Sequence, residues 1–196
     1  MAGILEVATV EFANKGLSGA RIDEIAAATQ TSKRMIYYYF GSKEGLYIRV
    51  LEESYRRMRS IEAGLNLQNL EPEVALRRLV EFTFDHHREN QNYIRLVMNE
   101  NIERGAYLAQ SKTIQELNVP AIAAIRELYD RGVAHGVFRA GLDPIDIHAS
   151  ISALTFFNVS NQHTFGLIFK ESPTSAGSVQ ARRASIADMV VRYVMA

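Results

Sequence analysis

The chain has 196 residues, of which 47% are hydrophobic and 22% are charged, a composition typical of a globular protein that buries a full core. The absence of cysteine excludes disulfides, thiolate catalysis and cysteine-based metal sites. Lysine plus arginine and aspartate plus glutamate both number 22, so the chain lacks the overall basic excess usual in nucleic-acid-binding domains, and only a local basic face could serve that role.

A helix is predicted at the start of the chain. Ile4, Ala8 and Phe12 repeat at four-residue spacing, which places them on one helix face, and the helix ends at Gly16. The same segment carries two glutamates and no long apolar run, so it does not have the pattern of a signal peptide. No stretch of the sequence approaches the roughly 18 apolar residues of a membrane span, and we expect a cytoplasmic protein.

Two short helices separated by a tight turn follow, at residues 22–28 and 32–40. Either Thr31 or Ser32 can cap the exposed N–H groups at the start of the second one. Ser42 then caps a long fourth helix, whose apolar stripe continues to about residue 65. Residues 33–49 hold four lysines and arginines against one glutamate, which makes this segment the local basic face of a neutral chain.

Five longer helical runs are predicted downstream. They cover residues 74–89, 92–104, 107–131, 144–170 and 179–195. Pro120 is expected to kink or split the third run, because a proline inside a helix removes a hydrogen bond and clashes with the preceding turn. Asp143 and Pro144 form a start signal for the fourth run, and the small polar residues 171–178 are expected to form a loop.

These patterns predict an all-α fold of about nine helices. We expect a three-helix helix-turn-helix domain at residues 1–47 and a larger helical domain at residues 48–196. Residues 144–170 carry apolar side chains on several faces, so that helix must be buried on more than one face. It therefore lies in the centre of a bundle, packs against a second subunit, or does both.

The two short helices have the size of a helix-turn-helix, in which the first residues of the second helix face base edges in the major groove of DNA. Here those residues are Ser32, Lys33, Arg34 and Met35. Lysine and arginine donate to guanine O6 and N7, and methionine offers an apolar contact to a thymine methyl group. The alternative interpretation is that Lys33 and Arg34 form an ordinary solvated face.

Three consecutive tyrosines, Tyr37, Tyr38 and Tyr39, cannot all point inward on one helix. At least one must present its hydroxyl outward, where a DNA phosphate is a natural acceptor. Ile36 and Phe40, four residues apart, are expected to form the buried side of the same helix. Simple aromatic packing between the short helices is the alternative interpretation of the tyrosines.

Lys43 lies in the first turn of the fourth helix, where a cation opposes the helix dipole. A DNA phosphate docked at that N-terminus would explain the lysine, because backbone N–H groups and the ammonium group would both face it.

Residues 4–50 resemble the DNA-binding domain of the TetR family of transcriptional regulators. The matching residues are Phe12…Gly16, Ile25-Ala26, Ser32-Lys33, Ile36-Tyr37-Tyr38-Tyr39-Phe40 and Ser42-Lys43-Glu44…Leu46. The resemblance implies a homodimer whose last two long helices, about residues 144–170 and 179–195, form a four-helix interface with their symmetry mates. It also implies a repressor that binds palindromic double-stranded operator DNA and is released by a small-molecule effector. A DNA-binding helical protein with no effector, acting architecturally or through a protein partner, remains the alternative.

The sequence departs from the family pattern in three places. The turn usually contains Ala-Gly-Val, and here Gln30 replaces the glycine, which implies about 1 kcal/mol of left-handed strain or a different turn. Arg21 stands where a small hydroxyl residue often opens the second helix, and we interpret it as a further phosphate contact. Many members carry a basic arm before the first helix, and we expect such contacts to be either absent or made by residues outside the given sequence.

By the same resemblance, an effector pocket lies among the central helices, within about residues 60–165. Our candidate polar and aromatic lining residues are Phe82, His86, Tyr93, Asn101, Phe156, Phe157, Asn158, Gln162 and His163. Their aromatic content suits a small, largely apolar or aromatic effector. For each residue alone, core packing or a dimer contact is the competing interpretation.

Other chemistries find no support in the sequence. Adjacent residues on a helix point about 100° apart, so His86 and His87 cannot chelate one metal ion together, and no His-x-x-x-His pair occurs. There is also no glycine-rich phosphate loop, serine elbow or convincing pair of acids. We expect neither an enzyme nor a protein that carries a cofactor or metal.

Overall fold

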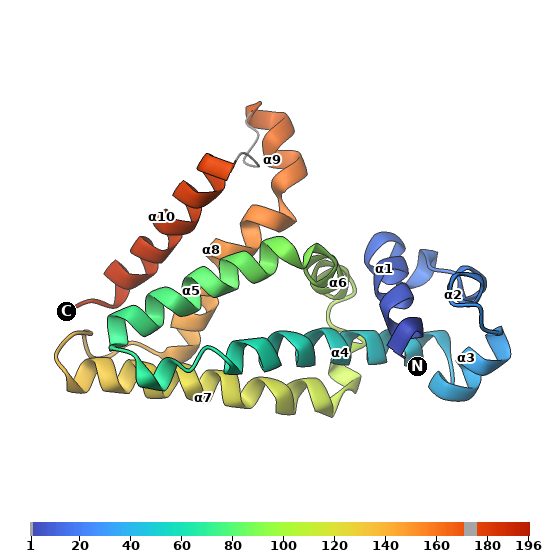
Figure 1. Cartoon of the computed structure of the whole chain (residues 1–196), viewed down its shortest axis with the longest axis horizontal. Helices are drawn as coiled ribbons and strands as arrows, with labels where there is room; N and C mark the ends of the chain where they lie inside the picture. The colour runs from blue at the N-terminus through green and yellow to red at the C-terminus, as the bar shows by residue number, and fades with distance from the viewer. Residues whose placement is uncertain (1, 171–175) are drawn as a thin grey trace. The chain divides into compact units, whose positions relative to one another are not determined.

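The computed structural model describes residues 2–170 and 176–196, and all the regular structure in these residues is helical (Figure 1). They form ten α-helices and two short 3₁₀-helices, with one isolated β-bridge between Phe138 and Met195. The predicted all-α class is therefore confirmed. Among the described residues, no helix combines the length and apolar character that crossing a membrane requires.

The described chain forms two compact units. The first contains the residues through Met58 together with Gln91–Leu117, and the second contains Arg59–Asn90 together with the residues from Asn118 onward. Two helices, α4 (Lys43–Ala63) and α7 (Lys112–Ala134), contribute residues to both units.

The first unit is built on α1 (Ala2–Gly19), α2 (Ile22–Ala28), α3 (Lys33–Phe40), the start of α4 and α6 (Gln91–Ile102). A 3₁₀-helix, η2 (Leu108–Gln110), connects α6 to α7. The buried core takes one or more apolar side chains from each α-helix, including Phe12, Ile25, Ile36, Leu46 and Leu96. Gly16 has a φ of 66° and breaks α1 into two helical pieces, as its expected role as a helix end requires.

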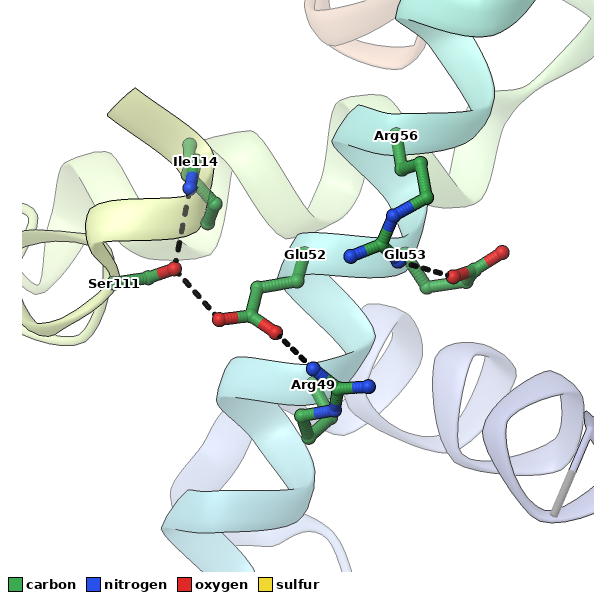
Figure 2. A network of polar contacts seen from close by, with 6 residues as sticks. All are labelled: Arg49, Glu52, Glu53, Arg56, Ser111 and Ile114. Atoms are coloured by element: carbon green, nitrogen blue, oxygen red, sulfur yellow. Dashed lines mark hydrogen bonds and ion pairs between the residues drawn. The ribbon is translucent and has the colours of Figure 1, made fainter. Parts of the chain in front are cut away.

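A buried carboxylate fixes the start of α7 to α4 in this unit (Figure 2). Glu52 is only 7% exposed, and its Oε1 accepts a hydrogen bond of 2.7 Å from the Ser111 hydroxyl. The same hydroxyl oxygen accepts the Ile114 N–H at 3.2 Å, so Ser111 caps α7. Arg49 pairs with the other carboxylate oxygen at 2.6 Å, which leaves neither oxygen of Glu52 without a donor.

The second unit contains η1 (Leu67–Asn69), α5 (Pro72–Glu89), most of α7, α8 (Pro144–Ser160), α9 (Gln162–Phe169) and α10 (Ala176–Val194). Its core joins α5, α7, α8 and α10 through buried residues such as Leu79, Ile125, Ile147 and Ile186. The Phe138 ring also packs here, so close to Gly132 that a Cβ on that residue would lie 1.9 Å from it. Only glycine fits at this position.

Two of the predicted helical runs have different bounds in the structure. Residues 144–170 form α8 and α9, because Asn161 between them leaves the helical region with φ −107° and ψ 3°. An asparagine side chain competes for backbone hydrogen bonds. Here the side-chain oxygen of Asn161 accepts a hydrogen bond from the Ser160 hydroxyl at 2.7 Å. Conversely, α7 continues through Pro120 without being split there, but begins only at Lys112. Of the predicted loop at residues 171–178, residues 171–175 lie outside the described residues, and the prediction is wrong for residues 176–178, which belong to α10.

Candidate nucleic-acid interface

The helices α2 and α3 lie on a well-packed support. Ile22, Ile25 and Ala26 of α2 and Ile36 of α3 are all buried in the core of the first unit. Phe40, the second residue expected on the inner side of α3, is partly buried against the same core. The pair is therefore a helix-turn-helix whose inner faces are held by apolar contacts and whose outer faces remain accessible.

The turn between these helices contains the strained residue that the sequence led us to expect. Gln30 has a φ of 50°, in the left-handed region that favours glycine. The hydroxyl of Thr29 donates to the carbonyl oxygen of Ile25 at 2.7 Å and helps to end α2. The departure from the usual Ala-Gly-Val turn thus keeps the left-handed backbone and changes only the side chain.

The first turn of α3 faces outward. Ser32 is its N-cap, because the Ser32 hydroxyl oxygen accepts the Met35 N–H at 3.2 Å. Lys33, Arg34 and Met35 are all exposed, while Thr31 just before the cap is partly buried. The residues expected to face base edges therefore share an accessible surface at the start of a capped helix.

The tyrosine run also points outward. Tyr38 is 79% exposed, and Tyr37 and Tyr39 are exposed as well. The rings of Tyr38 and Tyr39 contact each other edge to face at 5.4 Å between centroids. Tyr39 also contacts Phe40 of the same helix at 6.4 Å between ring centroids, and all three phenol side chains are accessible on the outer surface.

Two lysines of the interface have partners within the chain. Lys33 pairs with Asp23 of α2 at 2.5 Å, and both side chains are about half exposed. An exposed pair of this kind contributes about 0–1 kcal/mol, so phosphates can compete for the lysine. The Lys43 ammonium donates to the carbonyl oxygen of Ser18 at 3.3 Å, next to the N-terminus of α4 that Ser42 caps.

Arg21 occupies the N-cap position of α2 with an exposed side chain. Its side chain makes no capping hydrogen bond, while its backbone N–H donates to the Glu11 carboxylate at 3.2 Å. The guanidinium group is therefore not needed to end the helix.

The candidate effector residues fall into separate groups. Phe82 and His86 of α5 have ring centroids 5.7 Å apart, and Phe156 of α8 lies 6.0 Å from the neighbouring His87. Tyr93 belongs to the first unit, where its ring contacts Tyr55 at 5.5 Å.

Asn101 also belongs to the first unit, where it is exposed and donates to the Val97 carbonyl oxygen at 2.8 Å. His163 is exposed on α9 in the second unit. The remaining candidates line a cavity of about 320 Å³ among α8, α9 and α10. Its lining residues are Phe157, Asn158, Asn161, Gln162, Phe165 and Arg182.

Some polar residues of the second unit that the sequence analysis did not single out connect its helices. Arg59 of α4 pairs with Glu62 and donates from Nε to the Asn118 side-chain oxygen on α7 at 2.9 Å. Burial, followed by the neighbouring His86, Arg59 and His148, lowers the pKa of His87 to about 4. No sequence signal marks the bond between Arg59 and Asn118, because α4 and α7 are far apart along the chain.

Comparison with known proteins agrees with this architecture. Residues 4–50 match the family described as "Bacterial regulatory proteins, tetR family", and residues 72–190 match "Tetracyclin repressor-like, C-terminal domain". The HTH-type transcriptional repressor NicS of Pseudomonas putida is 36% identical over 161 residues, which cover 82% of this chain and 76% of NicS.

Two solved structures show the same fold. SCO4942 from Streptomyces coelicolor has a TM-score of 0.72 at 27% identity, covering 98% of this chain and 97% of SCO4942. AibR, solved in complex with isovaleryl coenzyme A and operator DNA, has a TM-score of 0.70 at 17% identity and covers 99% and 97% of the two chains. The chain with its helix-turn-helix and helical C-terminal region belongs to the TetR family of bacterial transcriptional regulators.

Proposed function

We propose that this protein is a ligand-responsive repressor that binds palindromic operator DNA as a homodimer. The observation that carries the proposal is the accessible face of α3, where Lys33, Arg34 and Met35 follow the Ser32 cap on a helix anchored by buried Ile36. The relative NicS is named as a repressor, and AibR was solved with operator DNA. Such a regulator acts in the cytoplasm, where bacterial DNA lies.

Each exposed group has a distinct role in this proposal. Arg34 and Lys33 donate to guanine edges, and Met35 contacts a thymine methyl group. The hydroxyls of the exposed tyrosines donate to phosphates, as do Arg21, Ser32 and Thr31 at the helix starts. Lys43 turns from the Ser18 carbonyl oxygen to a phosphate at the α4 N-terminus.

Homodimerisation is supported by two accessible stripes in the second unit. On α8, exposed Ile145, Ala149, Ala153 and Phe157 recur every four residues, on a different face from the buried Ile147 and Ile151. On α10, Ala181, Ser185, Met189 and Tyr193 recur at the same spacing and are also exposed. Ridges of residues four apart, with small side chains at their centre, allow helices to pack closely. We assign both stripes to the interface with a second copy.

Effector control requires the ligand to favour a conformation that binds DNA poorly. A shift from 1:99 to 99:1 between two conformations needs about 5.5 kcal/mol of differential affinity. The continuous helices α4 and α7 are suited to carry such a change, because each has residues in both compact units. AibR, which was solved with both isovaleryl coenzyme A and operator DNA, supports a protein of this fold that holds both kinds of partner.

Selection of bound duplexes from a random DNA pool tests the proposal. We expect a two-fold symmetric sequence whose half-sites lie about 34–36 Å apart, or a multiple of that distance, with an even number of chains on each duplex. Affinity should fall steeply as the salt concentration rises, because phosphate contacts release counterions. Enrichment of no sequence, or binding of one chain to an asymmetric site, would contradict it.

A further inference from the structure

The cavity of about 320 Å³ among α8, α9 and α10 has the size of a site for a small molecule. Sites of this kind measure roughly 300–1,000 Å³ and combine apolar walls with a few polar groups. The described lining has two aromatic rings, three side-chain amides and one arginine. These residues are Phe157, Phe165, Asn158, Asn161, Gln162 and Arg182.

A smaller cavity adjoins this one. The two share Asn158, Gln162 and Arg182, so they lie side by side within the second unit. The smaller cavity reaches α5, where it is lined by the exposed Arg88 and the buried Phe84. No acid belongs to the described lining of either cavity, and two guanidinium groups border them. The charge presented by the described lining is therefore positive.

Arg182 has donors that the described chain does not use. Its Nε donates to the side-chain oxygen of Asn158 at 3.1 Å, which orients the guanidinium group relative to α8. The neighbouring Arg183 is the arginine that pairs with Asp85 of α5, and no ion pair joins Arg182 to a described acid. The two terminal nitrogens of Arg182 therefore remain for a ligand.

Asn161 adds a second donor to the cavity. Its side-chain oxygen accepts a hydrogen bond from the Ser160 hydroxyl at 2.7 Å, and no hydrogen bond to a described residue uses its amide nitrogen. The groups that Arg182 and Asn161 leave for a ligand are thus all donors. They match a ligand whose polar end accepts hydrogen bonds or carries a negative charge.

The aromatic wall of the cavity is accessible. The rings of Phe157 and Phe165 meet edge to face with 5.9 Å between centroids, and Phe165 meets Phe169 at 4.6 Å. Phe157 is 44% exposed and Phe165 is 38% exposed. A ligand with an apolar body that covers these rings removes apolar surface from water, which favours binding.

We propose that this cavity binds a small organic carboxylate with an aromatic body, held by Arg182 and Asn161 and packed against Phe157 and Phe165. A guanidinium group presents parallel N–H groups that match the two oxygens of a carboxylate. Aromatic ligands pack edge to face or offset against phenylalanine rings. This inference rests on the proposed function only for its regulatory consequence, in which the carboxylate is the effector.

The position of the cavity suits an effector. The hydrogen bond between Arg182 and Asn158 joins α10 to α8, the two helices whose stripes we assign to the interface with a second copy. Phe157 is the last residue of the α8 stripe, and Arg182 follows Ala181 of the α10 stripe. A carboxylate bound here lies at the edge of that interface. It can therefore alter the pairing of two copies and, through it, the spacing of their recognition helices.

Matched pairs of ligands test the ligand class on the full-length protein. Benzoate, phenylacetate and cinnamate are each compared with the corresponding primary amide by isothermal titration calorimetry. We expect at least one carboxylate to bind about tenfold or more tightly than its amide, since hydrogen bonds to a charged group are the stronger ones. Amides that bind as well as their acids, or no binding by any acid at millimolar concentration, would overturn the ligand class.

Variants test the site. Arg182→Gln changes an exposed side chain and should lower the affinity for the carboxylate about tenfold or more, which removes most of its advantage over the amide. Arg126→Gln makes the same change at an exposed position of α7 in the same unit and should leave both affinities unchanged. Equal carboxylate binding by these two variants would overturn the site.

The aromatic wall has a test of its own. Phe165→Ala shortens a partly exposed side chain and should weaken the acid and its amide by the same factor, because both ligands have the same apolar body. Unchanged affinities for both ligands would contradict the contact with the phenylalanine rings.

Operator binding distinguishes this inference from the function on which it rests. We expect a saturating carboxylate to change the operator affinity of the wild type by about tenfold or more and that of Arg182→Gln much less. A carboxylate that binds through Arg182 but leaves operator affinity unchanged would uphold the site and contradict the effector role. A protein that selects no operator but still binds the carboxylate through Arg182 would contradict the proposed function and uphold the site.

Discussion

The backbone conformation of Gln30 is strained, and the sequence already indicated that it could be. Its φ of 50° is in the left-handed region, which is one of the two alternatives predicted at a position where related turns have glycine. A residue with a Cβ atom is destabilised by about 1–2 kcal/mol in that region, and a β-branched residue is destabilised further. The turn is therefore kept by the packing of α2 and α3 rather than by its own preference.

Substitution of Gln30 tests this account. Gln30→Gly should leave the free energy of unfolding unchanged or raise it by up to about 1 kcal/mol, whereas Gln30→Val should lower it by about 1 kcal/mol or more. At Gln115, an exposed right-handed position of α7, the order should reverse and glycine should be the less stable. Urea unfolding measures both pairs, and the same order at the two positions would contradict the strain.

His87 makes folding depend on pH. Its pKa falls from 6.5 to about 4 on folding, so the folded state favours the neutral ring. Stability is full above about pH 6.5 and is lost as the pH falls toward 4, by up to about 3 kcal/mol from this residue. His87→Phe should flatten the fall of unfolding free energy across that range. Parallel curves for the variant and the wild type would show that His87 does not titrate as described.

Among the helices, the starts were predicted best where the sequence has a residue that caps the N-terminus. Ser32, Ser42 and Asp143 begin helices as expected, because each side chain accepts a backbone N–H two or three residues ahead. The break at Asn161 was missed, because apolar residues continue on both sides of it. Of the two outcomes expected at Pro120, a split did not occur, because α7 continues from Lys112 to Ala134.

The N-cap of α7 should contribute more stability than that of α4. Ser111 is buried and also donates to the buried Glu52 (Figure 2), whereas Ser42 is exposed and caps the Gly45 N–H. Ser42→Ala should lower the free energy of unfolding by about 1 kcal/mol. Ser111→Ala should cost about 3 kcal/mol, because it also removes a donor from a buried carboxylate. Equal losses in thermal or urea unfolding would show that the Glu52 bond adds nothing.

The sequence predicted the fold class of the whole molecule, but it predicted less well which residues lie together in a site. The pattern from Phe12 to Leu46 encodes a local motif, so the helix-turn-helix could be found without coordinates. The hydrogen bond from Arg59 of α4 to Asn118 of α7 joins residues that are far apart along the chain, so no window of sequence reveals it. Candidates chosen as isolated polar or aromatic residues were consequently spread over both compact units.

The dimer can be tested at its proposed centre. Ala153→Glu places a charge in the middle of the exposed α8 stripe and should raise the dimer dissociation constant by about a hundredfold or more, because a buried unpaired charge is costly. Ala124→Glu makes the same change at an exposed position of α7 and should leave it unchanged. Analytical ultracentrifugation measures both, and a dimer that tolerates Ala153→Glu would place the interface elsewhere.

The most direct test of the DNA-binding face compares Arg34→Ala with Lys43→Ala on the selected operator and on a scrambled duplex, by fluorescence anisotropy at one salt concentration. Arg34→Ala should reduce the ratio of the two affinities by about tenfold or more, corresponding to about 1–3 kcal/mol of lost base discrimination. Lys43→Ala should weaken binding to both duplexes alike and leave their ratio unchanged. An unchanged ratio for Arg34→Ala would mean that the first turn of α3 does not read the bases.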